Sequence, residues 1–189
     1  MVVEVCATNF QSALNAQDAG ANRIELCSEL AVGGITPNYG LLKKVTSELN
    51  IPVHVLIRPR SGDFTYSDSD FEVMKQNIAL CKRLKCSGIV SGVLHKDMRV
   101  DMERTKELID LASPLTFTFH RAFDWTPDPI ATVKKLAEIG VARILTSGQA
   151  TSAVEGLPIL TKLKDTFTGT ILAAGGINLD NAAQFKAHA

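Results

Sequence analysis

The segment Arg23-Ile24-Glu25-Leu26-Cys27-Ser28-Glu29-Leu30-Ala31-Val32-Gly33-Gly34-Ile35-Thr36-Pro37 decides how this 189-residue chain is expected to fold. Its first five residues alternate between polar and apolar side chains, which indicates an extended strand with Glu25 and Cys27 on its polar face. The Gly33-Gly34 loop follows. Thr36-Pro37 is typical of a helix start, with the threonine as N-cap and the proline in the first turn. The segment therefore predicts a strand, a loop and a helix.

The Glu-x-Cys pattern of this strand occurs a second time, at Glu4-Val5-Cys6. A strand inside a parallel sheet is normally apolar on both faces. Two successive strands that each end in a carboxylate and a thiol on one face are therefore unusual, and they mark that face as a candidate functional surface.

Seven extended segments recur along the chain, and each is followed by a helical pattern of apolar residues. They are residues 2–6, 23–27, 52–58, 88–93, 115–119, 143–146 and 170–174. Further helix starts are predicted at Thr8 with Gln11, at Ser67 with Asp70, at Asp128-Pro129 and at Asn178. Repeated strand–helix units predict parallel strands. We expect an α/β fold of the TIM (β/α)8 barrel type, truncated after its seventh strand, in a single domain over residues 1–189 with the C-terminal unit missing. A flavodoxin-like open sheet would use about five strands and needs no polar interior, so we favour the barrel.

The composition excludes several classes of protein. Apolar residues make up 46% of the chain, which argues against disorder, and 20 basic residues balance 20 acidic ones, which argues against general nucleic-acid binding. No apolar run reaches the ~20 residues of a membrane span, and no signal peptide precedes the first strand. The four cysteines lack the spacing of a disulfide framework. We therefore expect a cytoplasmic protein with reduced thiols.

Polar residues gather where the predicted strands end, and the C-terminal strand ends carry the chemistry in TIM barrels. The set is Glu4, Cys6, Glu25, Cys27, Arg58, Arg60, His120, Arg121, Asp124, Ser147, Gly148, Gly175 and Gly176. We expect Arg58, Arg60 and Arg121 to hold an anion. Glu4, Glu25, His120 and Asp124 are the candidates for moving protons, since a histidine or a buried glutamate can titrate near neutral pH. The alternative is a network of ion pairs that closes the barrel mouth without a ligand.

Cys6 and Cys27 are expected at equivalent places on adjacent strands, which lie about 4.8 Å apart in a sheet. Two thiolates suit Cu(I), whereas a structural zinc ion would need four ligands and the sequence has no CxxC or HxxxH partner. The alternative is that both cysteines are buried small hydrophobic residues. Separately, Gly175-Gly176, with Ser147-Gly148 on the preceding strand end, resembles a phosphate-binding loop, although a tight turn would also need glycine.

Several blocks of sequence, in order along the chain, match one family. They are Glu4-Val5-Cys6, Arg23-Ile24-Glu25-Leu26-Cys27-Ser28, Gly33-Gly34-x-Thr36-Pro37, Ile57-Arg58-Pro59-Arg60-x-Gly62-Asp63-Phe64, Thr118-Phe119-His120-Arg121-Ala122-Phe123-Asp124, Leu145-Thr146-Ser147-Gly148 and Glu155-Gly156-Leu157. With these blocks the chain resembles the CutC copper homeostasis family.

The resemblance implies a cytoplasmic, TIM-barrel-like protein that handles copper and forms homo-oligomers, with dimers expected. It implies Cys6 and Cys27 as Cu(I) ligands. It also implies that the family continues for about another strand–helix unit and a half beyond the Gly175-Gly176 turn.

Three classes of function follow. The first is a Cu(I)-binding homeostasis protein that uses the two strand-end cysteines. The second is an enzyme that acts on a small anionic or phosphorylated metabolite. The third is an oligomeric scaffold with an ionic network at its mouth. The expected partners are a copper ion or a small molecule and a second copy of the chain, with no nucleic acid and no membrane.

Overall fold

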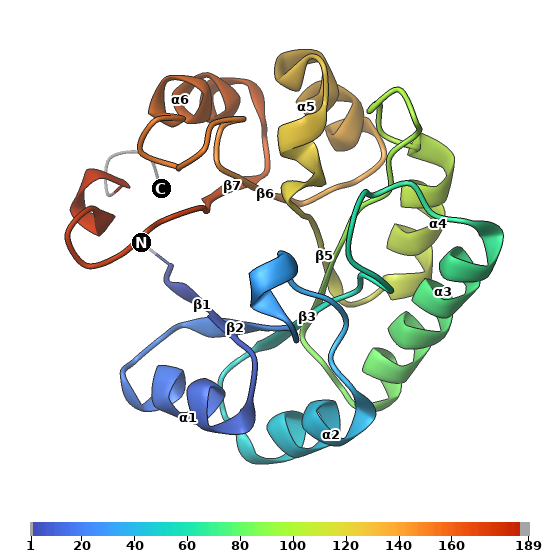
Figure 1. Ribbon diagram of the computed structural model, residues 1–189, viewed down its shortest axis with the longest axis vertical. Helices are drawn as coiled ribbons and strands as arrows, with labels where there is room; N and C mark the ends of the chain where they lie inside the picture. The colour runs from blue at the N-terminus through green and yellow to red at the C-terminus, as the bar shows by residue number, and fades with distance from the viewer. Residues whose placement is uncertain (1, 186–189) are drawn as a thin grey trace. The chain divides into compact units, whose positions relative to one another are not determined.

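A computed structural model of the chain describes residues 2–185 (Figure 1). Strands alternate with helices, and short 3-10 helices follow three of the strands. The elements are β1 (Glu4–Ala7), α1 (Phe10–Asp18), β2 (Arg23–Leu26), η1 (Leu30–Val32), α2 (Tyr39–Glu48), β3 (Val53–Leu56), α3 (Asp68–Arg83), β4 (Gly88–Ser91), α4 (Met102–Ala112), β5 (Thr116–Phe119), η2 (Arg121–Trp125), α5 (Pro129–Glu138), β6 (Arg143–Thr146), α6 (Leu157–Thr166), β7 (Thr170–Ala173) and η3 (Ala182–Phe185).

The seven strands follow one another in sheet order as they do in sequence, from β1 to β7. The pairs β1–β2, β2–β3, β3–β4, β5–β6 and β6–β7 are all parallel. This order confirms the prediction of sequential parallel strands from the repeated strand–helix units.

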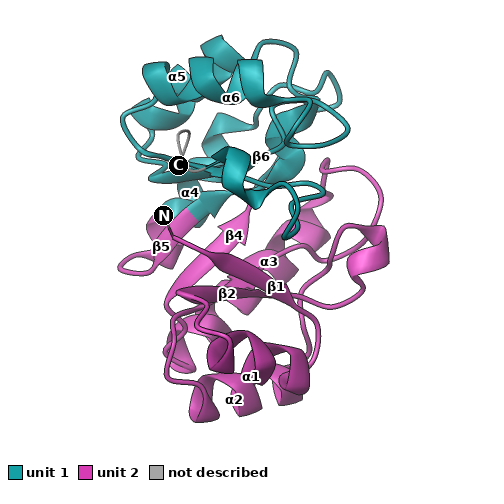
Figure 2. Cartoon of the chain, turned by 90° about the vertical axis from the view of Figure 1, so that its left-hand side faces the viewer, with its two compact units in different colours: residues 1, 92–109, 118–189 teal, residues 2–91, 110–117 magenta. Residues whose placement is uncertain are grey.

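The chain divides into two compact units, which Figure 2 shows in different colours. Unit 2 contains residues 2–91 and 110–117, and the described part of unit 1 contains residues 92–109 and 118–185. The prediction of a single domain over residues 1–189 stays a prediction. Among the described residues, no helix is both long enough and apolar enough to span a membrane.

Unit 2 is built on β1–β4, with α1, α2 and α3 packed along its strands (Figure 1). All four residues of β3 and of β4 are buried, as expected for strands that are covered on both faces. α3 begins with the predicted capping box, in which Ser67 and Asp70 bond each other's backbone N–H groups. Its buried face includes Met74, Ile78 and Cys81.

Unit 1 contains β6, β7 and the helices α5 and α6. α5 starts as predicted, with Asp128 as N-cap accepting a hydrogen bond from the Ala131 N–H and Pro129 in the first turn. A small apolar cluster forms where α6 packs against the strands and η3. It includes Ala153, Leu160 and Phe185.

Two helix starts differ from the prediction. α2 is capped by Asn38, whose side chain accepts from the Leu41 N–H at 3.0 Å, because the Thr36 hydroxyl is bonded elsewhere, to the backbone of Arg58. α1 is capped by Asn9 and Ser12 instead of Thr8 and Gln11.

The helix predicted after Asn178 is a turn followed by the 3-10 helix η3 as far as Phe185. The Asn178 side chain accepts from the backbone N–H groups of Asp180 and Asn181, as expected of a capping residue. The rest of that predicted helix, residues 186–189, lies outside the described residues.

Candidate functional site

One row of side chains crosses the sheet of unit 2. In the strand register Cys6 pairs with Glu25, Glu25 with His54, and His54 with Gly88. Residues in register on parallel strands point to the same face. The row therefore places a thiol, a carboxyl group and an imidazole side by side on neighbouring strands, and we call Cys6, Glu25 and His54 the polar row.

Glu4 lies one step before this row on the same face. Its Oε2 accepts a short hydrogen bond from Arg23 Nε and lies 3.7 Å from His54 Nδ1. Both Glu4 and Arg23 are nearly buried. Glu4 therefore joins an arginine on one side to an imidazole on the other, which satisfies a carboxylate that would otherwise be costly to bury.

Glu25 is a buried acid of unit 2 with one carboxyl oxygen left unpaired in the described part of the chain. It is only 5% exposed, and its Oε2 has no hydrogen-bond partner among the residues that the structure describes. Burial, and then the nearby charge of Glu4, raise the pKa of Glu25 to about 8. A carboxyl group of this kind is protonated at neutral pH and can donate or accept a proton there, which fits the proton-moving role predicted for it.

His54 is the buried histidine of the polar row. It is 3% exposed, and a Cβ atom on Gly88 would lie 2.8 Å from its Cδ2 atom. Glycine at position 88 therefore leaves the space that the ring fills. The signal in the sequence was parity, since His54 and Arg58 share one face of the same strand.

The two cysteines of the Glu-x-Cys motifs are not at equivalent places, contrary to the expectation. Cys6 is in register with Glu25, so Cys27 lies two residues further along its strand. Cys6 is exposed, while Cys27 is buried against Leu56 and Val90. The repeat of the motif could not reveal this offset, because it depends on how β1 and β2 pair.

The thiols of Cys6 and Cys27 both resist ionisation. Desolvation, followed by the charges of Glu25, Cys27 and Glu4, raises the pKa of Cys6 well above its usual range. Desolvation and then Glu25 raise the pKa of Cys27 to about 11. The strand register places the two thiols on one face of the sheet. Within residues 2–185, no group of three or more histidine, cysteine, aspartate or glutamate side chains is arranged to hold a metal ion.

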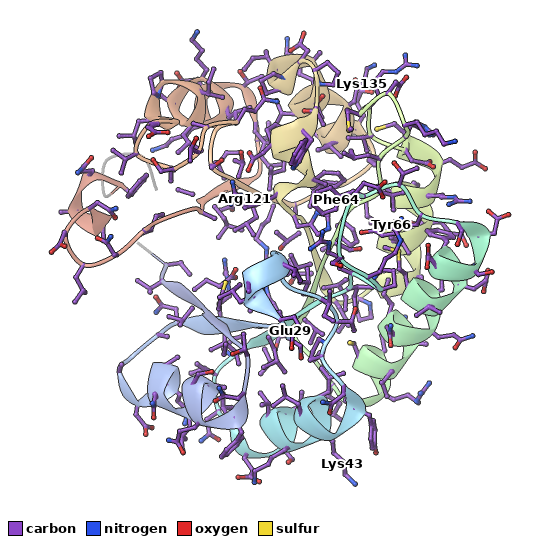
Figure 3. All side chains as sticks on the ribbon, viewed as in Figure 1. Glu29, Lys43, Phe64, Tyr66, Arg121 and Lys135 are labelled. Carbon is purple, nitrogen blue, oxygen red and sulfur yellow. The ribbon has the colours of Figure 1, made fainter. Side chains whose placement is uncertain are left out.

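Arg58, predicted to bind an anion, is engaged by the loops of unit 2. Its Nη1 donates to the carbonyls of Val32 (2.8 Å) and Gly34 (2.9 Å), and its Nη2 donates to the carbonyl of Gly62 (2.6 Å). The guanidinium lies 4.8 Å from the ring centroid of Phe64, which Figure 3 labels. Arg58 is only 4% exposed. Its burial and these contacts favour a structural role over the untested role in anion binding.

Arg60 likewise organises its own loop. Its Nη2 donates to Asp63 Oδ1 (2.9 Å) and to the carbonyl of Thr65 (2.5 Å). Its guanidinium lies over the ring of Tyr66, a residue that Figure 3 labels. Hydrogen bonding from Arg60 lowers the pKa of Asp63. The anion role predicted for Arg60 stays a prediction.

In unit 1, His120 begins the short helix η2. Its Nδ1 accepts a hydrogen bond from the Ala122 N–H at 3.3 Å, so a neutral ring carries its proton on Nε2. The ring is 4% exposed, and a Cβ atom on Gly92 would lie 2.9 Å from Nδ1. The backbone thus fixes the tautomer and the position of this predicted acid–base residue.

Asp124 accepts hydrogen bonds from several residues of the site in unit 1. Its carboxylate accepts from Arg121 Nε at 2.8 Å, from the backbone N–H and hydroxyl of Ser147, from the Gln149 N–H, and from the Thr146 hydroxyl in a short bond. A carboxylate that accepts this many hydrogen bonds is suited to holding Arg121 and the Ser147 loop in place. The proton-moving role predicted for Asp124 is untested, and its contacts favour positioning instead.

Arg121 is held by Asp124 at Nε and donates from Nη2 to Ser147 Oγ at 3.0 Å, while 44% of its side chain remains exposed (Figure 3). Gly175 and Gly176 both have positive φ angles, and a Cβ atom on Gly175 would lie 3.5 Å from Arg121 Nη1. The glycine backbone therefore passes close to an oriented guanidinium, and the phosphate-binding role of this loop stays a prediction.

Gly148 belongs to the same corner of unit 1. Its φ is +72°, and its N–H donates to the Thr146 hydroxyl at 2.9 Å. A Cβ atom on Gly156 would collide with the Ser147 carbonyl, so the two loops touch through their backbones. This contact fixes the Ser147-Gly148 segment beside Arg121. Sequence reasoning missed Gly156 as a part of the site, although its motif was noted.

The seven-stranded parallel order defines an α/β protein of the TIM-barrel type. A crystal structure of a candidate phosphonomutase from Burkholderia cenocepacia has this fold, with a TM-score of 0.69 over 99% of this chain and 84% of its own, at 13% identity. The sequence then narrows the class. Residues 1–189 match the CutC family, and the chain belongs to that family.

Individual CutC proteins are also similar to this chain. A CutC family protein of Proteus mirabilis is 45% identical over 184 residues, which cover 97% of this chain and 74% of the relative. One from Edwardsiella ictaluri is 46% identical over 187 residues, 98% of this chain and 74% of the relative. A crystal structure named as a candidate copper homeostasis protein CutC from Streptococcus agalactiae has a TM-score of 0.93 at 31% identity, covering 100% of this chain and 94% of its own.

Proposed function

We propose that this chain is a copper-handling protein of the CutC type that holds one Cu(I) ion between the thiolates of Cys6 and Cys27. The observation that carries the proposal is that both thiols lie on the same face of two paired strands, with Cys27 two residues beyond the register partner of Cys6. The copper homeostasis name of the Streptococcus agalactiae relative supports it. Copper is here the cargo of the protein, and soft thiolates are the ligands that Cu(I) prefers.

The surroundings of the two thiols bear on the strength of such a site. Cu(I) with two thiolates carries one net negative charge, which would be repelled by an ionised Glu25. Because the pKa of Glu25 is raised to about 8, this neighbour is neutral at pH 7 and the repulsion is absent. The raised pKa values of Cys6 and Cys27 mean that the ion must displace two protons, so binding should tighten as the pH rises.

Anaerobic titration of the protein against a Cu(I) chelator tests this proposal. We expect about one tightly held ion per chain, with the apparent affinity rising by up to about 100-fold per pH unit between pH 6 and 8, since two protons leave for each ion bound. Cys6→Ser and Cys27→Ser should each remove most of the binding, because a single thiolate leaves the ion without its second soft ligand.

Cys86→Ala is the matched control, since Cys86 is a buried free cysteine outside the polar row and should leave the titration unchanged. Unaltered affinity in both Cys6→Ser and Cys27→Ser would rule out this pair as the site. Binding that does not vary with pH would show that thiols of high pKa are not the ligands.

A second candidate function rests on the site in unit 1. There we propose that Arg121, Ser147, Gly148, Gly175 and Gly176 bind a small anion such as a phosphate group. The observation in its favour is the oriented and half-exposed guanidinium beside two glycines of positive φ. In this alternative the chain is an enzyme for an anionic metabolite, with His120 as the candidate for proton transfer in unit 1 and Asp124 as a positioning residue. The proton-transfer role of Glu4 and Glu25 is proposed separately, for the polar face of unit 2.

Melting temperatures with and without inorganic phosphate test the anion site. Phosphate at ten times its dissociation constant should stabilise the parent by about 1.4 kcal/mol, which corresponds to a rise of a few degrees. Arg121→Met should lose this phosphate-dependent rise whatever its own melting temperature. Arg99→Met, which removes an exposed arginine of the same unit, should keep it. An equal rise in Arg121→Met and in the parent would contradict the proposal.

The proposal also covers the location of the protein in the cell, its oligomeric state and its domain organisation. The four free cysteines support a reducing, cytoplasmic location, and the resemblance to the family supports a homodimer. A single domain over residues 1–189 is likewise proposed.

A further inference from the structure

Two cysteines without a role in the proposed function lie at the end of α3. Cys81 is in the last turn of the helix, and Cys86 lies just before β4. Both are buried, with 0% and 3% exposure. Both belong to unit 2, but they are on a helix end and not on the strands that carry the polar row.

The way α3 ends brings these two residues together. Leu84 is the C-cap, Lys85 has a left-handed φ of +57°, and its N–H donates to the carbonyl of Lys82 at 3.1 Å. The Cys86 N–H donates to the carbonyl of Cys81 at 3.0 Å. These two bonds make a Schellman motif, which typically packs the third-last helical residue against the second residue beyond the cap. Here both of those residues are cysteines.

The Schellman motif places the two cysteine side chains side by side. Hydrogen bonding between them lowers the pKa of Cys86 and raises that of Cys81. The pair therefore combines one sulfur that ionises more readily with a second thiol beside it. This is the arrangement of an attacking cysteine and its resolving partner.

From this geometry we propose that Cys81 and Cys86 form an oxidisable dithiol that closes to a disulfide with a hydroperoxide as the oxidant. The Cys86 thiolate attacks the peroxide, whose O–O bond breaks to leave a sulfenic acid and hydroxide. The Cys81 sulfur then attacks the sulfenic sulfur, its proton leaves with the hydroxyl group, and one water departs. In sum, two thiols and hydrogen peroxide give one disulfide and two waters.

A metal ion is a poorer occupant of the same pair. Two thiolates with a monovalent ion keep one net negative charge, which is costly here because both residues are buried, whereas Cys6 of the proposed copper pair is exposed. A disulfide is neutral and leaves no charge behind. The burial of both residues also favours a small oxidant such as hydrogen peroxide over a bulky disulfide reagent.

The positions of lysine and arginine in this segment make the test direct. Trypsin cleaves after Lys82, Arg83 and Lys85, so it separates the peptide 76–82, which contains Cys81, from the peptide 86–96, which contains Cys86. Only a disulfide holds the two peptides together. The double variant Cys6→Ser/Cys27→Ser leaves these two cysteines as the only thiols of the chain and makes the test independent of the copper proposal.

The folded double variant is treated with dilute hydrogen peroxide, blocked with iodoacetamide, denatured and digested. We expect both thiols to be lost together, a linked 76–82/86–96 peptide to form, and dithiothreitol to restore both free peptides. The folded protein should react at least about tenfold faster than the same variant unfolded in urea, since the fold holds the two side chains side by side. Unlinked peptides with free thiols, or linkage only in the unfolded chain, would overturn the proposal.

Discussion

Arg58→Met is expected to lower the free energy of unfolding by about 3–5 kcal/mol, the range for breaking a buried charged network. The arginine is 4% exposed and donates to three carbonyls, those of Val32, Gly34 and Gly62. Methionine fills similar space but has no donor, so these carbonyls would lose their partner on two loops of unit 2. A hydrogen bond to a charged group contributes about 1.5–3 kcal/mol, and of these three only the bond to Gly34 is fully buried.

Urea unfolding of matched variants measures this effect. Arg60→Met is the control, because Arg60 also bonds loop carbonyls but its side chain is 38% exposed and water can replace it. It should cost less than about 1 kcal/mol. Arg58→Lys should recover only part of the loss, since one ammonium group cannot span the forked contacts of the guanidinium. A loss below about 1 kcal/mol for Arg58→Met would instead support the anion role first predicted for this residue.

Much of the fold could be predicted because its signals are local. The Ser67 and Asp128-Pro129 helix starts depend on residues within one turn of each other, and the structure confirms both. The Thr36 N-cap was wrong, because the Thr36 hydroxyl bonds to Arg58, 22 residues away. The residues next to Thr36 in the sequence cannot show that the backbone of Arg58, beyond the end of β3, bonds its hydroxyl instead.

The candidate site was harder to predict for the same reason. The sequence correctly indicated a polar face on β1 and β2, yet not that Cys6 lies beside Glu25, since the register of parallel strands depends on packing. The arginines show a second limit. Their positive charge indicated anion binding, but the acceptors of Arg58 are backbone carbonyls, which every residue carries and no motif reveals.

Glu25→Gln is expected to stabilise the metal-free protein, and to do so more strongly as the pH rises. The pKa of Glu25 is about 8 in the folded state, against an ordinary value of 4.5. Between these values the folded chain keeps a proton that the unfolded chain has released. The free energy of unfolding therefore falls as the pH rises from about 4.5 to about 8, by up to about 1.4 kcal/mol per unit, and is level above that window.

Glutamine keeps the size and the polar character of the protonated acid but has no proton to lose. The stability difference between Glu25→Gln and the parent should therefore grow by about 2–3 kcal/mol from pH 5 to pH 7. Urea unfolding at intervals of half a pH unit, with a chelator present, measures it. Glu48→Gln, at an exposed position on α2, is the control for replacing a carboxyl group by an amide. A flat difference for Glu25→Gln would mean that Glu25 ionises in the folded chain as readily as in the unfolded one. In that case it could serve neither as a neutral neighbour for Cu(I) nor as a proton donor at neutral pH.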